Sequence, residues 1–115
     1  MARLQAGLWV SAYIRRVSQS GTFAAVVRRG DETAGAIFLK INTLGGDVLL
    51  LGPAMPSLDD TEPKRQWELR QRAAVEAEID QYIRREAERD PDLWVVEVED
   101  RTGNDYLLET EKAAE

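Results

Sequence analysis

The sequence has 115 residues, of which 43% are hydrophobic and 31% charged, and it contains no cysteine and no histidine. This length suits a single domain over residues 1–115, and the composition excludes a disordered or membrane-embedded chain. The two missing residue types exclude disulfides, zinc sites built from cysteine and histidine, and catalysis by a thiol or an imidazole.

The net charge of −6 is unevenly distributed along the chain. Residues 1–50 carry six Lys or Arg against three Asp or Glu, a balance of +3, and residues 51–115 carry nine against eighteen, a balance of −9. The overall acidity argues against nucleic acid as a partner, because binding to phosphates requires clustered cations. The basic first half instead allows a small anion-binding or partner-binding surface, unless its arginines are simply the solvated ends of a helix and a strand. The candidate residues are Arg15, Arg16, Arg28 and Arg29.

No apolar run approaches the roughly 20 residues that cross a bilayer. Near the N-terminus, polar residues interrupt the apolar ones, so no signal-peptide core is present. We therefore expect a cytoplasmic protein that has no contact with a membrane.

Residues 7–20 form the first element, and their pattern has two interpretations. Apolar residues recur at helical spacing between Val10 and Val17, and Gly21 provides a helix end. Residues 7–14 also alternate as a strand would. We favour the helix, because no turn divides the segment. Trp9 then lies off the apolar stripe, and we expect the chain tail or another subunit to cover it.

Three short apolar runs follow, over residues 23–27, 35–41 and 48–51. Runs of this kind, bounded by Gly, Asn and Asp, are typical of strands joined by hairpins. They predict an antiparallel meander as the floor of the fold. The second run is apolar on both faces and needs cover on both sides. Since the chain has only two good helices, a second copy would complete one face, and homodimerisation is a hypothesis on this ground.

Residues 53–64 contain three of the four prolines, which block helix continuation and strand pairing alike. We predict an exposed connector over this segment. After it, Trp67 and Leu69 alternate with polar neighbours. This alternation indicates either a short extra strand or an anchor at the entrance of the following helix.

Residues 71–89 carry the strongest helical pattern in the chain, with Val75, Ile79, Tyr82 and Ile83 on one face. Burying this face would hold the helix on the sheet, at about 1.5–3 kcal/mol for each large side chain that is fully buried. Opposite charges four residues apart on the other face add only a few tenths of a kcal/mol for each pair.

Residues 93–100 alternate as a half-buried strand. Trp94, Val96 and Val98 share one face of it, which we expect to meet the apolar stripe of the helix over residues 71–89. The turn after this strand leads to residues 106–108, which predict a returning edge strand.

The whole pattern predicts an α+β fold. We expect an antiparallel sheet of four to six strands, one long helix packed on one face, and an N-terminal helix that helps to cover the other. Residues 109–115 predict a frayed acidic tail.

Three segments of the chain stand in a specific order and spacing. They are Leu8-Trp9-Val10-Ser11-Ala12 running into Ile14-Arg15-Arg16, then Ala25-Val26-Val27-Arg28-Arg29-Gly30-Asp31 leading to Ala34-Gly35-Ala36-Ile37-Phe38, and finally Asp90-Pro91-Asp92-Leu93-Trp94-Val95-Val96-Glu97-Val98-Glu99-Asp100. Together they resemble a family of small bacterial proteins catalogued as domain of unknown function 1491. The resemblance extends from about Leu8 to Leu108, and it implies a free-standing cytosolic protein of bacteria. It transfers no site residue.

Carboxylates are the richest chemical resource in the sequence. Glu97 and Glu99 lie two residues apart on a predicted strand and therefore share a face. With Asp92 they offer oxygens to Mg²⁺, a hard cation that prefers carboxylate and water, and this set would support a metal-assisted hydrolase. No lysine accompanies them to position the attacking water. The polar outer face of a strand explains both glutamates without a metal.

Arg28 and Arg29 follow a predicted strand next to a turn, where two guanidinium groups suit a carboxylate or a phosphate. Pairing with the acidic second half of the chain is the competing explanation. From the sequence we predict a non-enzymatic binding or interaction module that self-associates, has an unidentified protein or a small anion as partner, and uses no cofactor. A carboxylate-dependent hydrolase is the alternative.

Overall fold

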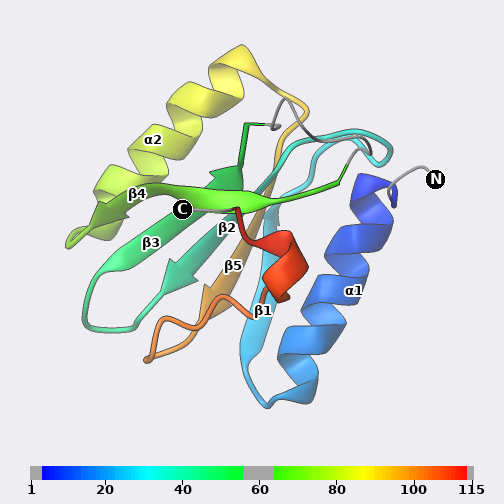
Figure 1. Ribbon diagram of the computed structural model, residues 1–115. Coiled ribbons are helices and arrows are strands. Elements are labelled where there is room, and N and C mark those ends of the chain that lie inside the picture. Colours follow the sequence, from blue (N-terminus) through cyan, green and yellow to red (C-terminus); the bar gives the residue numbers. More distant parts are fainter. Residues whose placement is uncertain (1–3, 56–63, 114–115) are drawn as a thin grey trace.

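The computed structural model describes residues 4–55 and 64–113 (Figure 1). Residues 56–63 of the predicted connector lie outside the described residues, and Pro53 is the last residue of a strand. The elements in chain order are α1 (Ala6–Gln19), β1 (Phe23–Arg28), β2 (Ile37–Asn42), β3 (Val48–Pro53), β4 (Trp67–Ala73), α2 (Glu76–Arg89), β5 (Trp94–Glu99) and the short 3-10 helix η1 (Glu109–Glu111).

The five strands form one mixed sheet in the order β1-β5-β2-β3-β4. Strands β2 and β3 pair antiparallel, as the predicted meander requires, but β1 does not lie beside β2. Strand β5 separates them, pairing parallel with β2 and antiparallel with β1. The prediction of a purely antiparallel sheet is therefore wrong. The physical reason is burial: the residues of β2 and β5 are buried or partly buried on both faces, so these strands occupy inner positions of the sheet.

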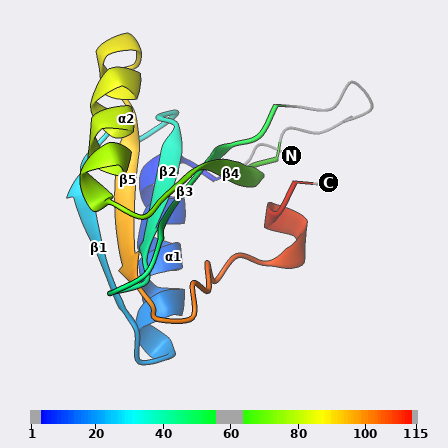
Figure 2. The same ribbon diagram turned by 90° about the vertical axis from the view of Figure 1, so that its left-hand side faces the viewer.

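The two helices cover opposite faces of the sheet, which Figure 2 shows from its edge. The cluster under α1 contains Trp94, Val96 and Val98, whereas Val95 faces α2. The prediction that Trp94, Val96 and Val98 meet the apolar stripe of the second helix is therefore wrong. The alternation of β5 shows which residues share a face, but it does not show which helix each face meets.

Helix α1 forms because its buried positions follow the helical repeat. Ala6, Trp9, Val10, Tyr13 and Val17 all lie in the core beneath it. Under a strand pattern, these five residues would fall on both faces. The helical interpretation of residues 7–20 therefore agrees with the structure.

Helix α2 begins later than the pattern over residues 71–89 predicts. Strand β4 continues to Ala73, and Val75 has an extended backbone and a 55% exposed surface. Ile79 is the fully buried member of the stripe, and Tyr82 and Ile83 pack partly against the same cluster. The segment between β4 and α2 is thus exposed, and the helix is anchored from Ile79 onward.

The chain tail covers Trp9, which is one of the two expected solutions. The indole Nε1 of Trp9 donates a hydrogen bond to Glu111 at 3.0 Å, and its ring stacks on Tyr13 with 4.9 Å between ring centroids. The centroid of the Trp67 ring lies 4.3 Å from that of the Trp9 ring. Three aromatic rings from α1 and β4 therefore pack as one group, and the tail contacts this group through Glu111.

The tail itself differs from its prediction. Residues 109–113 are ordered by η1 and by the Ala113 amide, which donates to the Trp67 carbonyl at 3.0 Å, while residues 114–115 of the predicted tail lie outside the described residues. Residues 106–108 do not form a strand, because Tyr106 has a positive φ of 59° that a strand does not accommodate. Burial of the Trp9 indole gives the tail a fixed position that its polar composition does not indicate.

Candidate functional site

The four predicted arginines lie at two separate places. Arg15 is exposed on α1, whereas Arg16 donates to the Tyr106 carbonyl at 2.7 Å and forms an ion pair with Glu111 at 2.9 Å. These contacts assign Arg16 to holding the tail. Burial raises the pKa of Glu111, but the hydrogen bond from Arg16 and those from the Leu108 amide and the Trp9 indole outweigh it and leave the pKa below its usual value.

Arg28 and Arg29 lie near the start of α1, far from Arg15 and Arg16. Strand β1 runs back along the helix, and the loop after it contacts the first turn of α1 (Figure 1). Arg28 donates to the Pro91 carbonyl at 3.1 Å. Arg29 pairs with Glu32, and its guanidinium carbon lies 5.4 Å from the centroid of the Trp94 ring. Both arginines therefore contact their own chain, and the structure does not unite them with Arg15 and Arg16.

The carboxylates of the alternative site are also apart. Asp92 lies in the turn before β5, and Glu97 and Glu99 lie toward the far end of that strand. Over residues 4–55 and 64–113, no three acidic side chains form a group that could hold a metal ion. Glu97 has a different neighbour, since the Nζ atom of Lys40 is 3.8 Å from its carboxylate.

Lys40 is a feature that the sequence analysis missed. It lies on the α2 side of β2 with a side chain only 6% exposed, and its Nζ atom contacts Glu76 at 2.5 Å and Asp80 at 2.7 Å. Burial lowers the pKa of Lys40, but hydrogen bonds with Asp80 and Glu76 and the charge of Glu97 outweigh it, so the pKa lies above its usual value. The group therefore stays charged and ties α2 to the sheet. The sequence signal for this buried ion pair is a single lysine within an otherwise apolar strand.

A second polar group joins the end of β5 to the tail. Asp100 accepts hydrogen bonds from the hydroxyls of Thr102 and Tyr106, and the Tyr106 hydroxyl also lies 2.7 Å from that of Thr22. The bonds from Thr102 and then Tyr106 lower the pKa of Asp100 to about 2. This group fixes the tail where it leaves the sheet.

The free edge of β1 is the least satisfied surface of the sheet. Strand β1 is the last in the sheet order, and no strand of the described chain pairs with its outer side (Figure 2). Its residues 23–27 are uncharged, and Phe23 and Val27 are 57% and 55% exposed. An edge that presents unpaired backbone groups beside apolar side chains is a template for pairing with another strand.

Neither helix protects this edge fully. Helix α1 contacts β1, and Ala24 packs against the core beneath this helix, but Phe23, Val26 and Val27 remain exposed. The register between β1 and β5 shifts between Val26 and Arg28, which places Val27 at an irregularity. Such a bulge ends regular pairing near the end of the strand. The accessible edge is therefore short.

The opposite edge, β4, carries the usual protection. Glu68, Arg70 and Arg72 place charges along it, and Arg72 forms an ion pair with Asp47 at 3.5 Å. Its first residue, Trp67, is already bridged to Lys112 of the tail. Charged side chains and added cover are the means by which proteins prevent pairing at an edge. The two edges of this sheet therefore differ in their readiness to bind another strand.

No helix within the described ranges has the length and apolar content that would allow it to span a membrane.

The fold defines a small α+β protein whose mixed five-stranded sheet carries one helix on each face. Residues 4–108 match the family model described as Protein of unknown function (DUF1491), and the chain belongs to this family. The resemblance seen in the sequence is thereby confirmed.

Solved structures of bacterial proteins support the assignment. A crystal structure of a DUF1491 family protein from Caulobacter crescentus is 38% identical, with a TM-score of 0.79, covering 97% of this chain and 98% of that one. An NMR structure of a DUF1491 family protein from the same organism is 40% identical, with a TM-score of 0.79 and 97% of each chain covered. The solution structure of protein Atu0922 from A. tumefaciens is 45% identical, with a TM-score of 0.73, covering 84% of this chain and 86% of that one. No curated protein matches the chain.

The ion pairs of Lys40 give a first prediction. Lys40→Met leaves the largely buried carboxylate of Glu97 without its cation, so we expect the free energy of unfolding to fall by about 2 kcal/mol, less than for a fully buried pair because Glu76 and Asp80 are half exposed. Adding Glu97→Gln to this variant removes the unpaired charge and should recover part of the loss. Urea denaturation measures both. A Lys40→Met variant as stable as the parent would show that the ion pairs contribute nothing.

The pKa of Asp100 gives a second prediction. Because the folded-state pKa lies below the ordinary 3.8, Asp100 adds stability above that pH, and this contribution disappears as the pH falls through about 2. An NMR titration of the side-chain carboxyl should find its midpoint near pH 2. Thr102→Ala should raise the midpoint toward 3.8, whereas Thr33→Ala, at a remote turn, should leave it unchanged. A midpoint near 3.8 in the parent protein would contradict the hydrogen bonds described.

Proposed function

We propose that this protein is a non-enzymatic interaction module of the bacterial cytosol, and that it self-associates by pairing the free edge of β1 with β1 of a second copy. The observation that carries the proposal is the difference between the two sheet edges. Residues 23–27 are uncharged and apolar, with Phe23, Val26 and Val27 exposed, while β4 is charged and partly covered by the tail. An unprotected edge in a protein with one protected edge indicates a surface that is used.

A second copy is the partner that best fits this edge. Two β1 strands related by a two-fold axis run antiparallel, so each supplies the backbone donors and acceptors that the other lacks. Without charge over residues 23–27, the self-pairing meets no repulsion between like side chains. The two sheets then continue as one. In both copies, Phe23 and Val27 lose exposed surface at the new strand pair.

The size of this contact predicts a weak dimer. Complete burial of a large apolar side chain stabilises by about 1.5–3 kcal/mol, and Phe23 and Val27 are already half covered, so each contributes less than that. Pairing of one short strand buries less surface than a standard stable interface. The association should therefore depend on concentration in the micromolar range.

Arg28 and Arg29 end the proposed interface. Their contacts with Pro91, Glu32 and Trp94 favour a role in fixing the end of β1 over the capture of an anion. Binding of an anionic partner by these residues stays a prediction of the sequence. The alternative function, a metal-assisted hydrolase, gains no support from the geometry, because Lys40 lies next to Glu97 at the place where the cation would bind.

Sedimentation analysis across the micromolar range tests the proposal. We expect a reversible dimer for the parent protein and a monomer for Val27→Lys, because a lysine on this edge places a charge against the apolar side chains of the facing strand. Leu69→Lys is the matched control, since Leu69 is also half exposed but lies on the β4 edge. It should dimerise as the parent does.

Two results would contradict the proposal. A parent protein that remains monomeric at every concentration would remove self-association. A dimer that survives Val27→Lys but is lost with Leu69→Lys would place the interface on the other edge. Circular dichroism of both variants shows that any change in mass is not caused by unfolding.

A further inference from the structure

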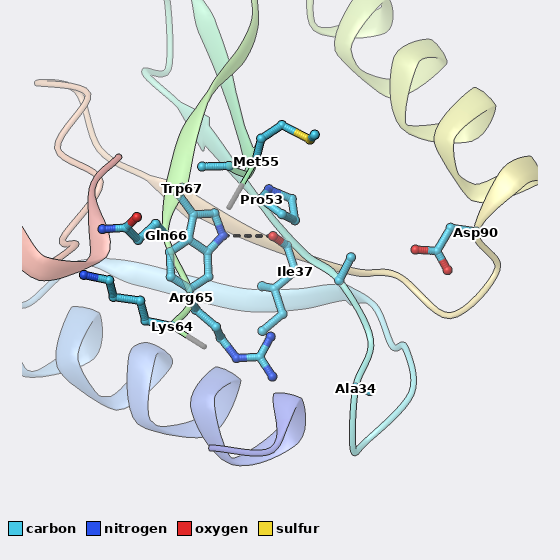
Figure 3. A pocket seen from close by; sticks show the side chains of 11 residues that line it. Ala34, Ile37, Pro53, Met55, Lys64, Arg65, Gln66, Trp67 and Asp90 are labelled. Atoms are coloured by element: carbon cyan, nitrogen blue, oxygen red, sulfur yellow. Dashed lines mark hydrogen bonds between the residues drawn. The ribbon is translucent and has the colours of Figure 1, made fainter. Parts of the chain in front are cut away.

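A pocket of about 230 Å³ lies at the end of the sheet where β2 begins, β3 ends and β4 begins (Figure 3). It lies away from the β1 edge and plays no part in the proposed self-association. Its apolar wall comes from three separate segments: Ala36 and Ile37 at the start of β2, Pro53 and Met55 at and just after the end of β3, and Trp67 of β4.

The apolar wall is preformed at its centre. The indole Nε1 of Trp67 donates to the Ile37 carbonyl at 2.9 Å, so the ring is held in place and its polar atom is already satisfied (Figure 3). At the mouth, Met55 is 85% exposed, the most exposed of the large apolar side chains in the described chain. Methionine adapts its shape to different ligands, and a flexible apolar side chain beside a fixed aromatic ring is typical of ligand pockets.

The polar groups of the pocket are unequal. Lys64 lies at one side of Trp67 and Asp90 at the other (Figure 3). Within the described chain Lys64 forms no ion pair, whereas Asp90 accepts a hydrogen bond from the Asp92 amide at 3.2 Å and shapes the turn before β5. The second cation of the lining, Arg65, donates to the Leu4 carbonyl at 3.0 Å, so Lys64 is the cation that we assign to a ligand. The carboxylate of Asp90 repels any negative charge placed near it.

We infer that this pocket binds a small monocarboxylate with a compact apolar body. The body would pack on Trp67 and Met55 while its carboxylate pairs with Lys64. The volume is below the roughly 300–1,000 Å³ of pockets for drug-sized ligands, which favours a small ligand over a nucleotide. Asp90 opposes a second negative charge, so a monoanion fits better than a phosphate ester.

Benzoate is a suitable probe, with benzamide as its neutral isostere and phenyl phosphate as the dianion. In an NMR titration of the backbone amides, we expect benzoate to shift the signals of Ala36, Ile37 and the Trp67 indole, with a millimolar dissociation constant. Benzamide and phenyl phosphate should each bind at least several-fold more weakly. Added salt should weaken benzoate binding, because an exposed ion pair is screened.

Charge reversal at Lys64 distinguishes binding in the pocket from a general effect of the net charge of the protein. Lys64→Glu should weaken benzoate roughly tenfold or more, because it replaces attraction by repulsion. Arg15→Glu, an equal change in net charge at an exposed position on α1, should leave the affinity unchanged. Both residues are exposed, so neither variant should alter the melting temperature.

Several outcomes would overturn the inference. Benzoate and benzamide could bind equally well, or Lys64→Glu and Arg15→Glu could lower the affinity for benzoate equally. The chemical shift changes could also map to Arg28 and Arg29 instead of the pocket, or benzoate could cause none. Each of these results is independent of the oligomeric state, so it leaves the proposed self-association intact.

Discussion

The structure depends on the burial of β2 and β5 from both sides. These two strands pair in parallel at the centre of the sheet, and each presents apolar side chains to both helices. A parallel pair needs a long connection, which is supplied by β3, β4 and α2. Within the described chain, Lys40 is the one charged residue buried in this centre, and it is accepted because Glu76, Asp80 and Glu97 surround it.

This arrangement decides which surfaces remain for binding. Helix α1 contacts β1 and helix α2 contacts β3 and β4 on the faces of the sheet, so the hydrogen-bonding edges of β1 and β4 must be protected by other means. The tail and a row of charges protect β4, and Trp9 holds the tail through Glu111. Strand β1 has neither kind of protection over residues 23–27. The edge of β1 is therefore the unprotected edge of this sheet.

Local pattern predicts much of this fold. It identifies α1, the β2–β3 hairpin, the two-sided burial of β2 and the need to cover Trp9. It does not predict that β5 lies between β1 and β2, because the pattern of residues within a strand does not show which strands pair with it. The apolar run over residues 23–27 would look the same at an edge of the sheet as inside a meander. For the same reason, the exposure of Phe23 is visible only in the structure. Lys40 finds its partners 36 and 40 residues away, and no local pattern shows contacts of that kind.

Amide hydrogen exchange at low and high protein concentration is the most direct test of the central claim, that the β1 edge is completed by a second copy. The outward-facing amides of residues 23–27 should become more protected as the concentration rises, while the amides along β4 do not change. Protection of β1 that is independent of concentration would contradict the account, and so would a gain in protection confined to β4.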